Sequence, residues 1–594
     1  MSVSKHLIAI IGAGPAGIFA ANQLANAGHE VVIINRDVKP GGLAEYGIYY
    51  TKYRMKEGLR QQFHKIFSNE NIHYFGNVTI GTRADISLDD LRQLGFDAIL
   101  VTVGAQGTKW LGLPGEFLAG VYHAKDLVYH YNQLPPYSQR NYEIGKRVAL
   151  IGIGNVMTDI ARWLIHDIKV DEVIALARRG PAEVKFAKKE MESIICNLDM
   201  KAFDAELQRS APAMEAIGQD VNEAKAYILS ALPDACDATS HTRFLIRFLS
   251  APSAILDAGD GRACGLEVDE TILLRRDDEI FAKPTGNRHV EDVDTVVFCI
   301  GDRVDEGFGL PVKWNEYVKN PKPRFPIEGN SYETYDLQTN SPIEGVFVAG
   351  WARKASDGLV GIARKDGENG AKAVLAYLDT IVHPPGAKDV LAEFEERLRQ
   401  VGKPFVTTMD WLRLEEIEKQ EAERHQLPAF RFNTNEEMLS AIGLVLQTFI
   451  RPLRTTDMAE WMRLRIDLWP LCSVQVHEQE MDDIIINPHE ATVFVSPKTG
   501  GGLNGFIEIG IRAYAEGCTT NRVGYIDGVY VEPEIRQRGI GRALMTAAES
   551  WARSKGCREM GSNVEVENLT SQYIHKRLGY KEAERLVHFR KNLL

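Results

Sequence analysis

The chain has 594 residues, of which 44% are hydrophobic and 25% are charged, and its formal net charge is −12. This composition is typical of a folded protein of three or four domains, and it excludes a basic nucleic-acid-binding stripe and any apolar run of the roughly 18 residues that a membrane helix needs. We therefore expect a cytoplasmic protein with neither a nucleic-acid nor a membrane partner. The seven cysteines form no C-x-x-C pair, so we expect no redox dithiol, iron–sulfur cluster or metal site, and we expect the cysteines to be buried.

A strand–glycine–helix unit opens the chain. An apolar strand at residues 7–11 runs through Gly12, Gly14 and Gly17 into a helix, and a second apolar strand follows at residues 31–34. In a dinucleotide-binding fold the first glycine makes the tight turn, the second lets backbone approach the pyrophosphate, and the third lets helix and strand pack closely. Continuously apolar strands that alternate with helices predict an α/β fold with a parallel sheet covered on both faces.

A second unit of the same kind contains Gly152 and Gly154, and its second strand covers residues 173–177. Two such units in one chain predict two bound nucleotides. The second strand ends at Arg178 and Arg179, where an acidic residue would bind a ribose 2′-hydroxyl and an arginine accommodates a 2′-phosphate. The sequence therefore predicts NADP(H) rather than NAD(H) at this unit.

The rest of the chain divides by composition. Residues 386–448 are mostly charged and helical in pattern, which predicts a docked tail and linker, and the pattern restarts afterwards as a new domain. The predicted segments are residues 1–142 and 306–385 for the first nucleotide-binding domain, 143–305 for a second one inserted into it, 386–448 for the tail and linker, and 449–594 for the last domain.

A third glycine turn lies in the last domain. A strand with alternating valines, ending at Val529 and Val531, runs through residues 536–541 into a helix that begins near Arg542. The pattern R/Q-x-x-G-x-G/A lets successive main-chain N–H groups surround a pyrophosphate at a helix N-terminus. A P-loop is excluded because no G-K-[ST] follows.

The motifs of about the first 440 residues resemble the adrenodoxin-reductase-like ferredoxin–NADP reductases of the glutathione-reductase fold. The matching stretches are 12–17, 41–48, 152–162, 178–181 and 350–351. The resemblance implies two Rossmann-like domains, with the NADP(H) domain inserted into the FAD domain, and a ferredoxin or another electron acceptor as partner. The residues that it implies at FAD are Gly12, Gly14, Pro15, Ala16, Gly17, Asn35, Gly42, Leu43, Gly350, Trp351, Gly358 and Ile362, and those at NADP(H) are Gly152, Gly154, Asn155, Val156, Arg178, Arg179 and Glu190.

This chain departs from that family at three places. Asn35 stands where the family usually has an acid that holds the adenosine ribose, Lys52 stands at a usual histidine, and residues 356–358 replace a frequent Pro-Thr-Gly. An amide still bonds a hydroxyl, so FAD remains the prediction. The identity of the electron acceptor stays open.

The C-terminal signature is that of the GNAT N-acetyltransferases, and residues 449–594 as a whole resemble the aminoglycoside 6′-N-acetyltransferases. The matching stretches are 465–470, 505–508, 527–531, 556–559 and 584–591. The resemblance implies an α+β domain that transfers acetyl from acetyl-CoA to a primary amine of an aminoglycoside-like molecule, and dimer formation through this domain. The residues that it implies at acetyl-CoA are Val529, Val531, Arg536, Gln537, Arg538, Gly539, Ile540, Gly541, Arg542 and Asn568.

A polycationic acceptor needs carboxylates, and Glu508 and Asp527 occupy matching positions. Asp527 is the predicted general base, because the amine must lose a proton before it attacks the thioester. His575 stands where many GNAT proteins have a tyrosine that protonates the leaving thiolate, although packing beneath CoA would explain it equally well. Asn563 replaces a usual aspartate, which leaves the exact acceptor open.

Three hypotheses remain at this point. Both domains are active enzymes, or a working acetyltransferase is attached to a reductase that has lost its electron partner, or the GNAT domain is a non-catalytic CoA-sensing or partner-binding module. Intact glycine turns favour nucleotide binding under all three hypotheses. The carboxylates beside the thioester position favour the bifunctional enzyme.

Overall fold

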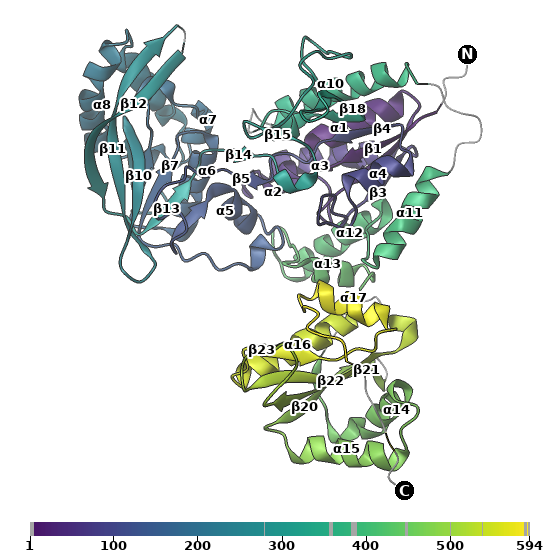
Figure 1. Cartoon of the computed structure of the whole chain (residues 1–594). Coiled ribbons are helices and arrows are strands. Elements are labelled where there is room, and N and C mark those ends of the chain that lie inside the picture. Colours follow the sequence, from purple (N-terminus) through teal and green to yellow (C-terminus); the bar gives the residue numbers. More distant parts are fainter. Residues whose placement is uncertain are drawn as a thin grey trace. The chain divides into compact units, whose positions relative to one another are not determined.

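The computed structural model describes residues 5–277, 279–355, 360–381, 389–445, 450–498, 501–536, 539–586 and 591. The chain forms two compact units, residues 1–401 with 405–435 and residues 436–594 with 402–404, which are described separately (Figure 1). Within those ranges, none of the helices is long and apolar enough to cross a bilayer. The same ranges bring together no group of three or more His, Cys, Asp or Glu side chains that would hold a metal ion.

A six-stranded sheet forms the core of the first nucleotide-binding domain. Its strand order is β17-β18-β4-β1-β2-β3, and all neighbours are parallel except β17 and β18. Helices α1 and α10 pack together on one face, and α4 and α11 cover the other. The elements are β1 (Leu7–Ile11), α1 (Pro15–Asn26), β2 (Glu30–Ile34), α2 (Leu43–Tyr46), α3 (Tyr53–Phe67), β3 (Ile72–Phe75), α4 (Leu88–Leu94), β4 (Ala98–Val101), β15 (Val312–Lys313), β16 (Glu316–Tyr317), β17 (Glu333–Asp336), β18 (Ser341–Val348), α10 (Val360–Leu378) and α11 (Val390–Val401).

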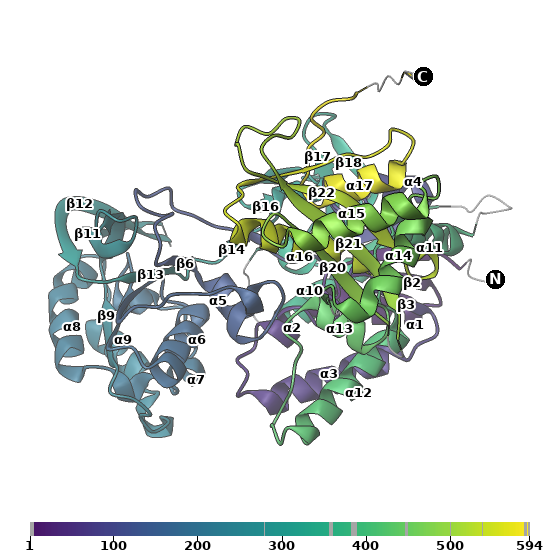
Figure 2. The same ribbon diagram turned by 90° about the horizontal axis from the view of Figure 1, so that it is seen from below.

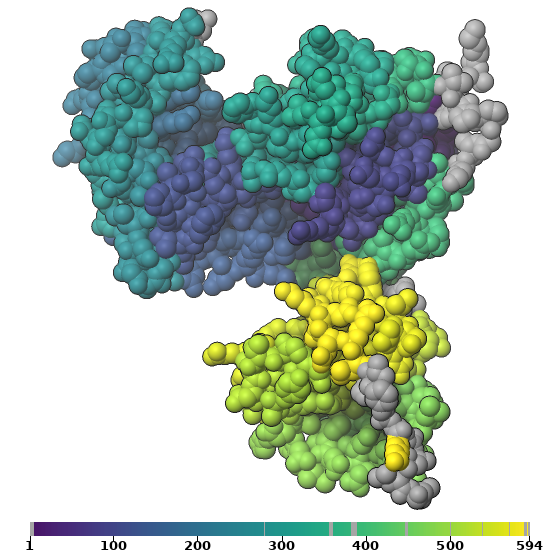
Figure 3. Space-filling model, in the orientation of Figure 1, coloured from purple at the N-terminus to yellow at the C-terminus, as the bar shows by residue number. Residues whose placement is uncertain are grey.

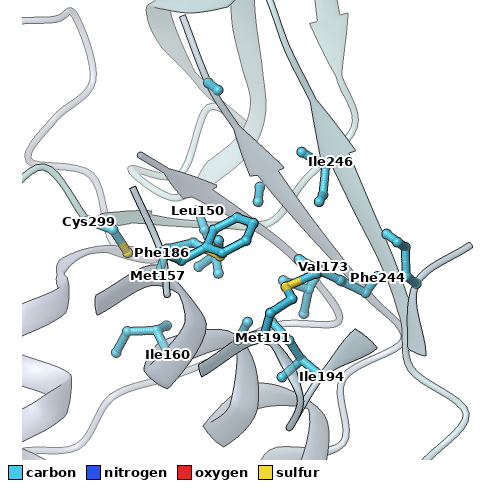
Figure 4. Close-up of a cluster of buried hydrophobic side chains, with 14 of the residues drawn as sticks. Leu150, Met157, Ile160, Val173, Phe186, Met191, Ile194, Phe244, Ile246 and Cys299 are labelled. Carbon is cyan, nitrogen blue, oxygen red and sulfur yellow. The ribbon is translucent and has the colours of Figure 1, made fainter. Parts of the chain in front are cut away.

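The second sheet is fully parallel, with the order β6-β13-β7-β8-β9. Helices pack on one face and the antiparallel sheet β10-β11-β12 packs on the other (Figure 2). The helix face is closed by side chains such as Leu150, Met157 and Phe244, which meet in the cluster of Figure 4. The elements are β6 (Val121–His123), α5 (Ala124–Tyr131), β7 (Arg147–Ile151), α6 (Asn155–Trp163), β8 (Glu172–Leu176), α7 (Lys188–Met191), α8 (Met200–Glu215), α9 (Val221–Leu229), β9 (Arg243–Arg247), β10 (Ser250–Asp257), β11 (Ala263–Arg276), β12 (Glu279–Glu291) and β13 (Thr295–Phe298).

The chain passes between the two sheets at β5 (Gly107–Thr108) and β14 (Asp302–Arg303), which pair with each other. Strand β6 already belongs to the second sheet, where it pairs with β13. The inserted segment therefore starts earlier than the predicted residue 143. A three-residue edge strand has too little periodicity to be assigned from sequence, and its hydrogen bonds to β13 decide where it belongs.

The tail helices are α11, α12 (Thr408–Arg424) and α13 (Asn435–Ala441). Helix α12 packs on the first sheet beside β3. Trp411 is buried there against the rings of Phe67 and Tyr74, and Lys39 forms a buried ion pair with Glu418. The boundary between the two compact units lies after residue 435, so α12 belongs to the first unit.

The second unit is an α+β domain built on the sheet β19-β20-β21-β22-β23. Helices α14 and α15 pack on one face and α16 on the other (Figure 1). The space-filling view shows one side of this unit in green to yellow (Figure 3). Neighbouring strands are antiparallel except β22 and β23. The elements are β19 (Arg451–Pro452), α14 (Met458–Leu468), α15 (Val474–Ile486), β20 (Ala491–Pro497), β21 (Leu503–Arg512), β22 (Val523–Val531), α16 (Ile540–Ser554), β23 (Glu559–Ser562) and α17 (Leu569–Arg577).

The expectation of buried cysteines is wrong for four of the seven. Cys299 and Cys557 are buried, and Cys518 is partly exposed. The exposed cysteines are Cys196, Cys236, Cys264 and Cys472. Burial is decided by which face of an element meets the core, and an isolated cysteine carries no such information in its sequence context.

Candidate active sites

The first glycine turn follows β1. Gly12 has φ +108°, and a Cβ there would lie 2.6 Å from the main-chain oxygen of Thr102. A Cβ at Gly17 would lie 2.1 Å from the main-chain oxygen of Gly12, so helix α1 approaches the turn as closely as a glycine permits. A Cβ at Gly14 would have no atom of the described residues within 4 Å, and Gly14 is also the N-cap of α1. The turn therefore offers open space at the point where a helix N-terminus attracts an anion.

Asn35 directly follows β2 and is only 7% exposed. Its Oδ1 accepts a hydrogen bond of 3.1 Å from the main-chain N–H of Ala13, and its Nδ2 donates to the carbonyls of Asp37 and Lys39. These bonds hold the glycine turn against the end of β2. The amide is thus engaged within the protein, and the geometry gives Asn35 a positioning role beside the turn.

The remaining residues expected at the first nucleotide lie around this turn. Gly42 has φ +50°, and a Cβ there would lie 3.1 Å from Cα of Gly14, while a Cβ at Gly350 would lie 2.7 Å from Cβ of Ala16. Pro15 is the first residue of α1, Leu43 begins α2, Trp351 is partly exposed beside Gly350, and Ile362 is an exposed residue of α10. Gly358 lies outside the described residues.

The second glycine turn repeats the geometry of the first. Gly152 has φ +115°, and a Cβ there would lie 2.5 Å from the main-chain oxygen of Cys299, whereas nothing lies within 4 Å of a Cβ at Gly154. Gly154 is the N-cap of α6, and Asn155 and the exposed Val156 follow in its first turn. The Asn155 side chain accepts a hydrogen bond of 2.8 Å from the main-chain N–H of Ala187. Asn155 thereby fixes the segment that leads into α7.

Arg178 and Arg179 follow β8, the strand next to β7, so they lie at the same edge of the sheet as the second turn. Their carbonyls accept hydrogen bonds from Thr271 and Leu249, which fixes the backbone there. Arg178 is exposed, and Nε of Arg179 is buried without a hydrogen-bond partner in the described part of the chain. A buried, unpaired guanidinium N–H is a site that an anionic ligand would satisfy.

One ion pair links the two nucleotide-binding domains. Lys52, just before α3, donates a hydrogen bond of 2.5 Å to Glu190 of α7, and its Nζ lies 3.8 Å from the Asp159 carboxylate. The lysine that replaces the family's usual histidine is therefore paired with one of the residues expected at NADP(H). The structure brings these two residues together although 138 positions separate them.

The third glycine turn leads into α16. Gly539 has φ +87° and is the N-cap of α16, and among the described residues a Cβ at Gly541 would meet only Cγ2 of Val531, at 3.9 Å. The Arg536 guanidinium donates to the Val531 carbonyl at 2.8 Å. Arg542 is part of the first turn of α16, whose second residue is Gly541, and Ile540 is buried. Gln537 and Arg538 lie outside the described residues.

Strand β22 carries an irregularity at Asp527. Glu508 pairs with Gly528 and Ile509 pairs with Ile526, so Asp527 has no partner in β21 and forms a β-bulge. A bulge redirects a side chain away from the regular alternation. Strand β23 pairs with β22 only from Val523 to Ile526, so in the described residues the edge from Asp527 to Val531 is free of a neighbouring strand on that side. This edge offers main-chain groups to an extended ligand.

Glu508 lies in the protein interior and is 2% exposed. Its Oε1 accepts hydrogen bonds of 2.7 Å from Trp461 Nε1 and 2.6 Å from Arg465. Burial raises the pKa of Glu508 to about 7, against the lowering effect of the buried Arg465 guanidinium. Its carboxylate therefore holds α14 to the sheet, and it would influence an acceptor through Arg465.

We expect Glu508→Ala to lower the free energy of unfolding of the second unit by about 3 kcal/mol, because the buried Arg465 loses its buried carboxylate and keeps only the exposed Glu480 as an ionic partner. Calorimetry should show that this unit unfolds at a lower temperature than in the wild type. The exposed Glu490→Ala is the control, with no change beyond about 0.5 kcal/mol. Equal transitions for the two variants would contradict this role of Glu508.

His575 lies on α17 and contacts the end of β23. Its Nδ1 is 2.8 Å from the Ser571 carbonyl, and its Nε2 is 3.1 Å from the Ser562 hydroxyl. Because a carbonyl only accepts, Nδ1 carries a hydrogen and donates it to Ser571, while Nε2 lies within hydrogen-bond distance of the Ser562 hydroxyl. Asn568, expected at acetyl-CoA, caps α17 through a 3.0 Å hydrogen bond from the Ser571 N–H.

The sequence by itself did not identify three charged residues near the predicted carboxylates, namely Arg465, Glu480 and Arg512. Arg512 donates a 2.5 Å hydrogen bond to Asp527, and Arg465 pairs with both Glu508 and Glu480. Their pairing depends on which residues two neighbouring strands and two helices place together. The sequence shows charged residues on α14 and at the end of β21. It does not show which of them meet, because that depends on the register of the strands.

Comparisons with known proteins match both parts of the chain. The model of the acetyltransferase (GNAT) family matches residues 458–580, and that of the pyridine nucleotide-disulphide oxidoreductases matches residues 6–204. The chain is 27% identical over 468 residues to the NADPH-ferredoxin reductase FprA of Mycobacterium leprae, covering 73% of this chain and 98% of that protein. It is 38% identical over 146 residues to aminoglycoside N(6′)-acetyltransferase type 1 of Klebsiella aerogenes, covering 24% of this chain and 96% of that protein.

The structure of Mycobacterium tuberculosis FprA in complex with NADPH has the fold of the first unit, with a TM-score of 0.61 and 24% identity over 74% of this chain and all of that one. These comparisons confirm the predicted fold class and the two predicted resemblances. The chain therefore belongs, through its C-terminal domain, to the GNAT acetyltransferase family, and this domain is fused to a part that is similar to the ferredoxin–NADP reductases.

Proposed function

We propose that the chain carries two active sites, one for FAD-dependent oxidation of NADPH and one for acetyl transfer from acetyl-CoA to a polycationic primary amine, such as the 6′-amino group of an aminoglycoside. The observation that carries this proposal is the geometry shared by three glycine turns. At each turn a glycine with positive φ leads into a helix N-terminus, and a second glycine, Gly14, Gly154 or Gly541, faces nearly open space. Each turn thus fits a diphosphate, the group that FAD, NADP(H) and CoA share.

In the reductase half, the flavin and the nicotinamide supply the hydride chemistry when bound, and the chain's residues bind and orient them. Gly12, Gly14 and Gly17 would admit the FAD pyrophosphate, with Asn35 holding the turn. Arg178 and Arg179 would pair with the NADP(H) 2′-phosphate. The acceptor of the electrons is a ferredoxin or another redox partner.

The flavin assignment is tested by filling the open space of the first turn. Gly14→Val adds a side chain whose Cβ would have no atom of the described residues within 4 Å, and φ at this residue is −83°, so the fold should be kept while FAD is excluded. We expect wild-type protein to be yellow and the variant to lack flavin absorbance with an unchanged circular dichroism spectrum. Gly58→Ala, on α3 and also in open space, is the control that should stay yellow.

In the acetyltransferase half, Asp527 would accept a proton from the acceptor ammonium, directly or through one water. The neutral amine then attacks the thioester carbon and a C–N bond forms. The nitrogen releases its second proton to water, the C–S bond breaks, and the sulfur leaves as a thiolate. Main-chain N–H groups between Val529 and Val531 would polarise the thioester carbonyl along the open edge of β22. His575 would return a proton to the sulfur.

The two halves are tested separately. NADPH should bleach the flavin, and acetyl-CoA with kanamycin or tobramycin should release free thiol that a chromogenic disulfide detects. Binding of CoA without thiol release, across a panel of aminoglycosides and polyamines, would reject the acetyltransferase and leave a CoA-sensing domain. Flavin binding without reduction by NADPH would reject the oxidoreductase.

A further inference from the structure

The Asp527 carboxylate is occupied by a cation that belongs to the protein itself. Arg512, the last residue of β21, donates a 2.5 Å hydrogen bond to Oδ1 of Asp527. The Arg512 guanidinium carbon lies 3.6 Å from the centre of the Tyr525 ring, so the cation is held against an aromatic face as well as a carboxylate. Both side chains are partly exposed, 48% for Arg512 and 37% for Asp527.

The position of this pair follows from the strand geometry. Asp527 is the bulged residue of β22, and a Cβ at Gly510 would lie 3.3 Å from its Oδ2, so Asp527 lies over Gly510 on the sheet. Glycine at position 510 leaves room for the carboxylate on the face that also carries Glu508 and Arg512. On the same face, helices α14 and α15 contribute Arg465 and Glu480, which complete the charged groups around Asp527.

We propose that Arg512 is a resident cation that an acceptor ammonium must displace from Asp527, and that it thereby determines how strongly a cationic amine has to bind. This inference rests on the acetyltransferase function proposed above. A guanidinium on a carboxylate and a ring has the charge, donors and aromatic contact that a substrate ammonium would need at the same place. Displacing Arg512 costs binding free energy. An acceptor with several ammonium groups recovers this free energy by also binding the neighbouring Glu480, whereas a monoamine cannot.

If the acceptor ammonium replaces Arg512 at Asp527, removing Arg512 should change KM and leave kcat nearly unchanged. Exposed ion pairs contribute at most about 1 kcal/mol, so Arg512→Gln should lower KM for kanamycin about threefold to fivefold and leave kcat within about twofold. Arg512→Lys keeps a cation there and should stay close to wild type. Arg522→Gln, an arginine of similar exposure whose Nε bonds the Lys555 carbonyl, is the matched control with unchanged constants.

A pH profile separates displacement from a purely structural effect. Burial raises the pKa of Asp527 and the Arg512 guanidinium lowers it, with further effects from Glu480 and Arg465, and Glu508 interacts with the same carboxylate. Removing Arg512 therefore raises the pKa of Asp527 further. The acid limb of kcat/KM should move to higher pH in Arg512→Gln and not in Arg522→Gln.

The outcomes separate this inference from the proposed function. A wild-type protein that acetylates kanamycin, with Arg512→Gln showing an unchanged or higher KM, overturns the role of Arg512 alone. A wild-type protein that neither binds kanamycin by calorimetry nor releases thiol overturns both. If Arg512→Gln unfolds at a lower temperature, kanamycin calorimetry at a temperature where this variant is folded still decides the question, since Arg512→Gln should then bind kanamycin more tightly than wild type.

Discussion

Replacing Asp527 by asparagine should lower kcat for acetyl transfer to kanamycin about a thousandfold, the effect expected when a general base is removed without a change in size. Asp527 occupies the bulge of β22 where pairing with β23 has ended, and the stretch from Val529 to Val531 follows it on the same strand. Free thiol released from acetyl-CoA measures the rate.

The same variant should change the pH dependence. Burial raises the pKa of Asp527, and the group must be ionised to take a proton, so in the wild type kcat/KM rises with pH through this pKa. In Asp527→Asn that limb should disappear. Asp483→Asn, on the exposed part of α15, is the control and should keep wild-type rates. Undiminished thiol release by Asp527→Asn would remove this residue from the mechanism.

The double variant Arg178→Ala with Arg179→Ala should lose about a thousandfold in its preference for NADPH over NADH. Hydrogen bonds to charged groups contribute about 1.5–3 kcal/mol each, and two arginines would each bond the 2′-phosphate. Both follow β8 at the sheet edge that also holds the second glycine turn, and Nε of Arg179 has no partner in the described residues. Stopped-flow bleaching of the flavin by each nucleotide gives the ratio.

The control for this pair is Arg262→Ala, since Arg262 lies in the β10–β11 hairpin and pairs with Glu143. It should leave the preference unchanged. NADH rates should stay near wild type in the double variant, because the 2′-phosphate is the difference between the two nucleotides. A double variant that still prefers NADPH would show that another group binds this phosphate.

Parts of the two sites could be predicted because their geometry is local. A turn with positive φ favours glycine, which is why Gly12, Gly152 and Gly539 indicate such turns in the sequence, and at Gly12 and Gly152 the main chain also approaches too closely for a Cβ. Arg178 and Arg179 were predicted for a similar reason, since the end of the second strand has a fixed place in this fold. The fold class followed from the same units.

The sequence by itself determined the order of strands, glycine turns and helices, and with it the two Rossmann-like domains and the GNAT domain. Only the tertiary structure decided which charges meet. It buried Glu508 against Arg465, gave Asp527 the cation of Arg512, engaged the Asn35 amide with the first turn, and paired Lys52 with Glu190. The reason is physical: backbone conformation is a property of neighbouring residues, whereas the partner of a side chain depends on strand register and helix packing between segments far apart in the chain.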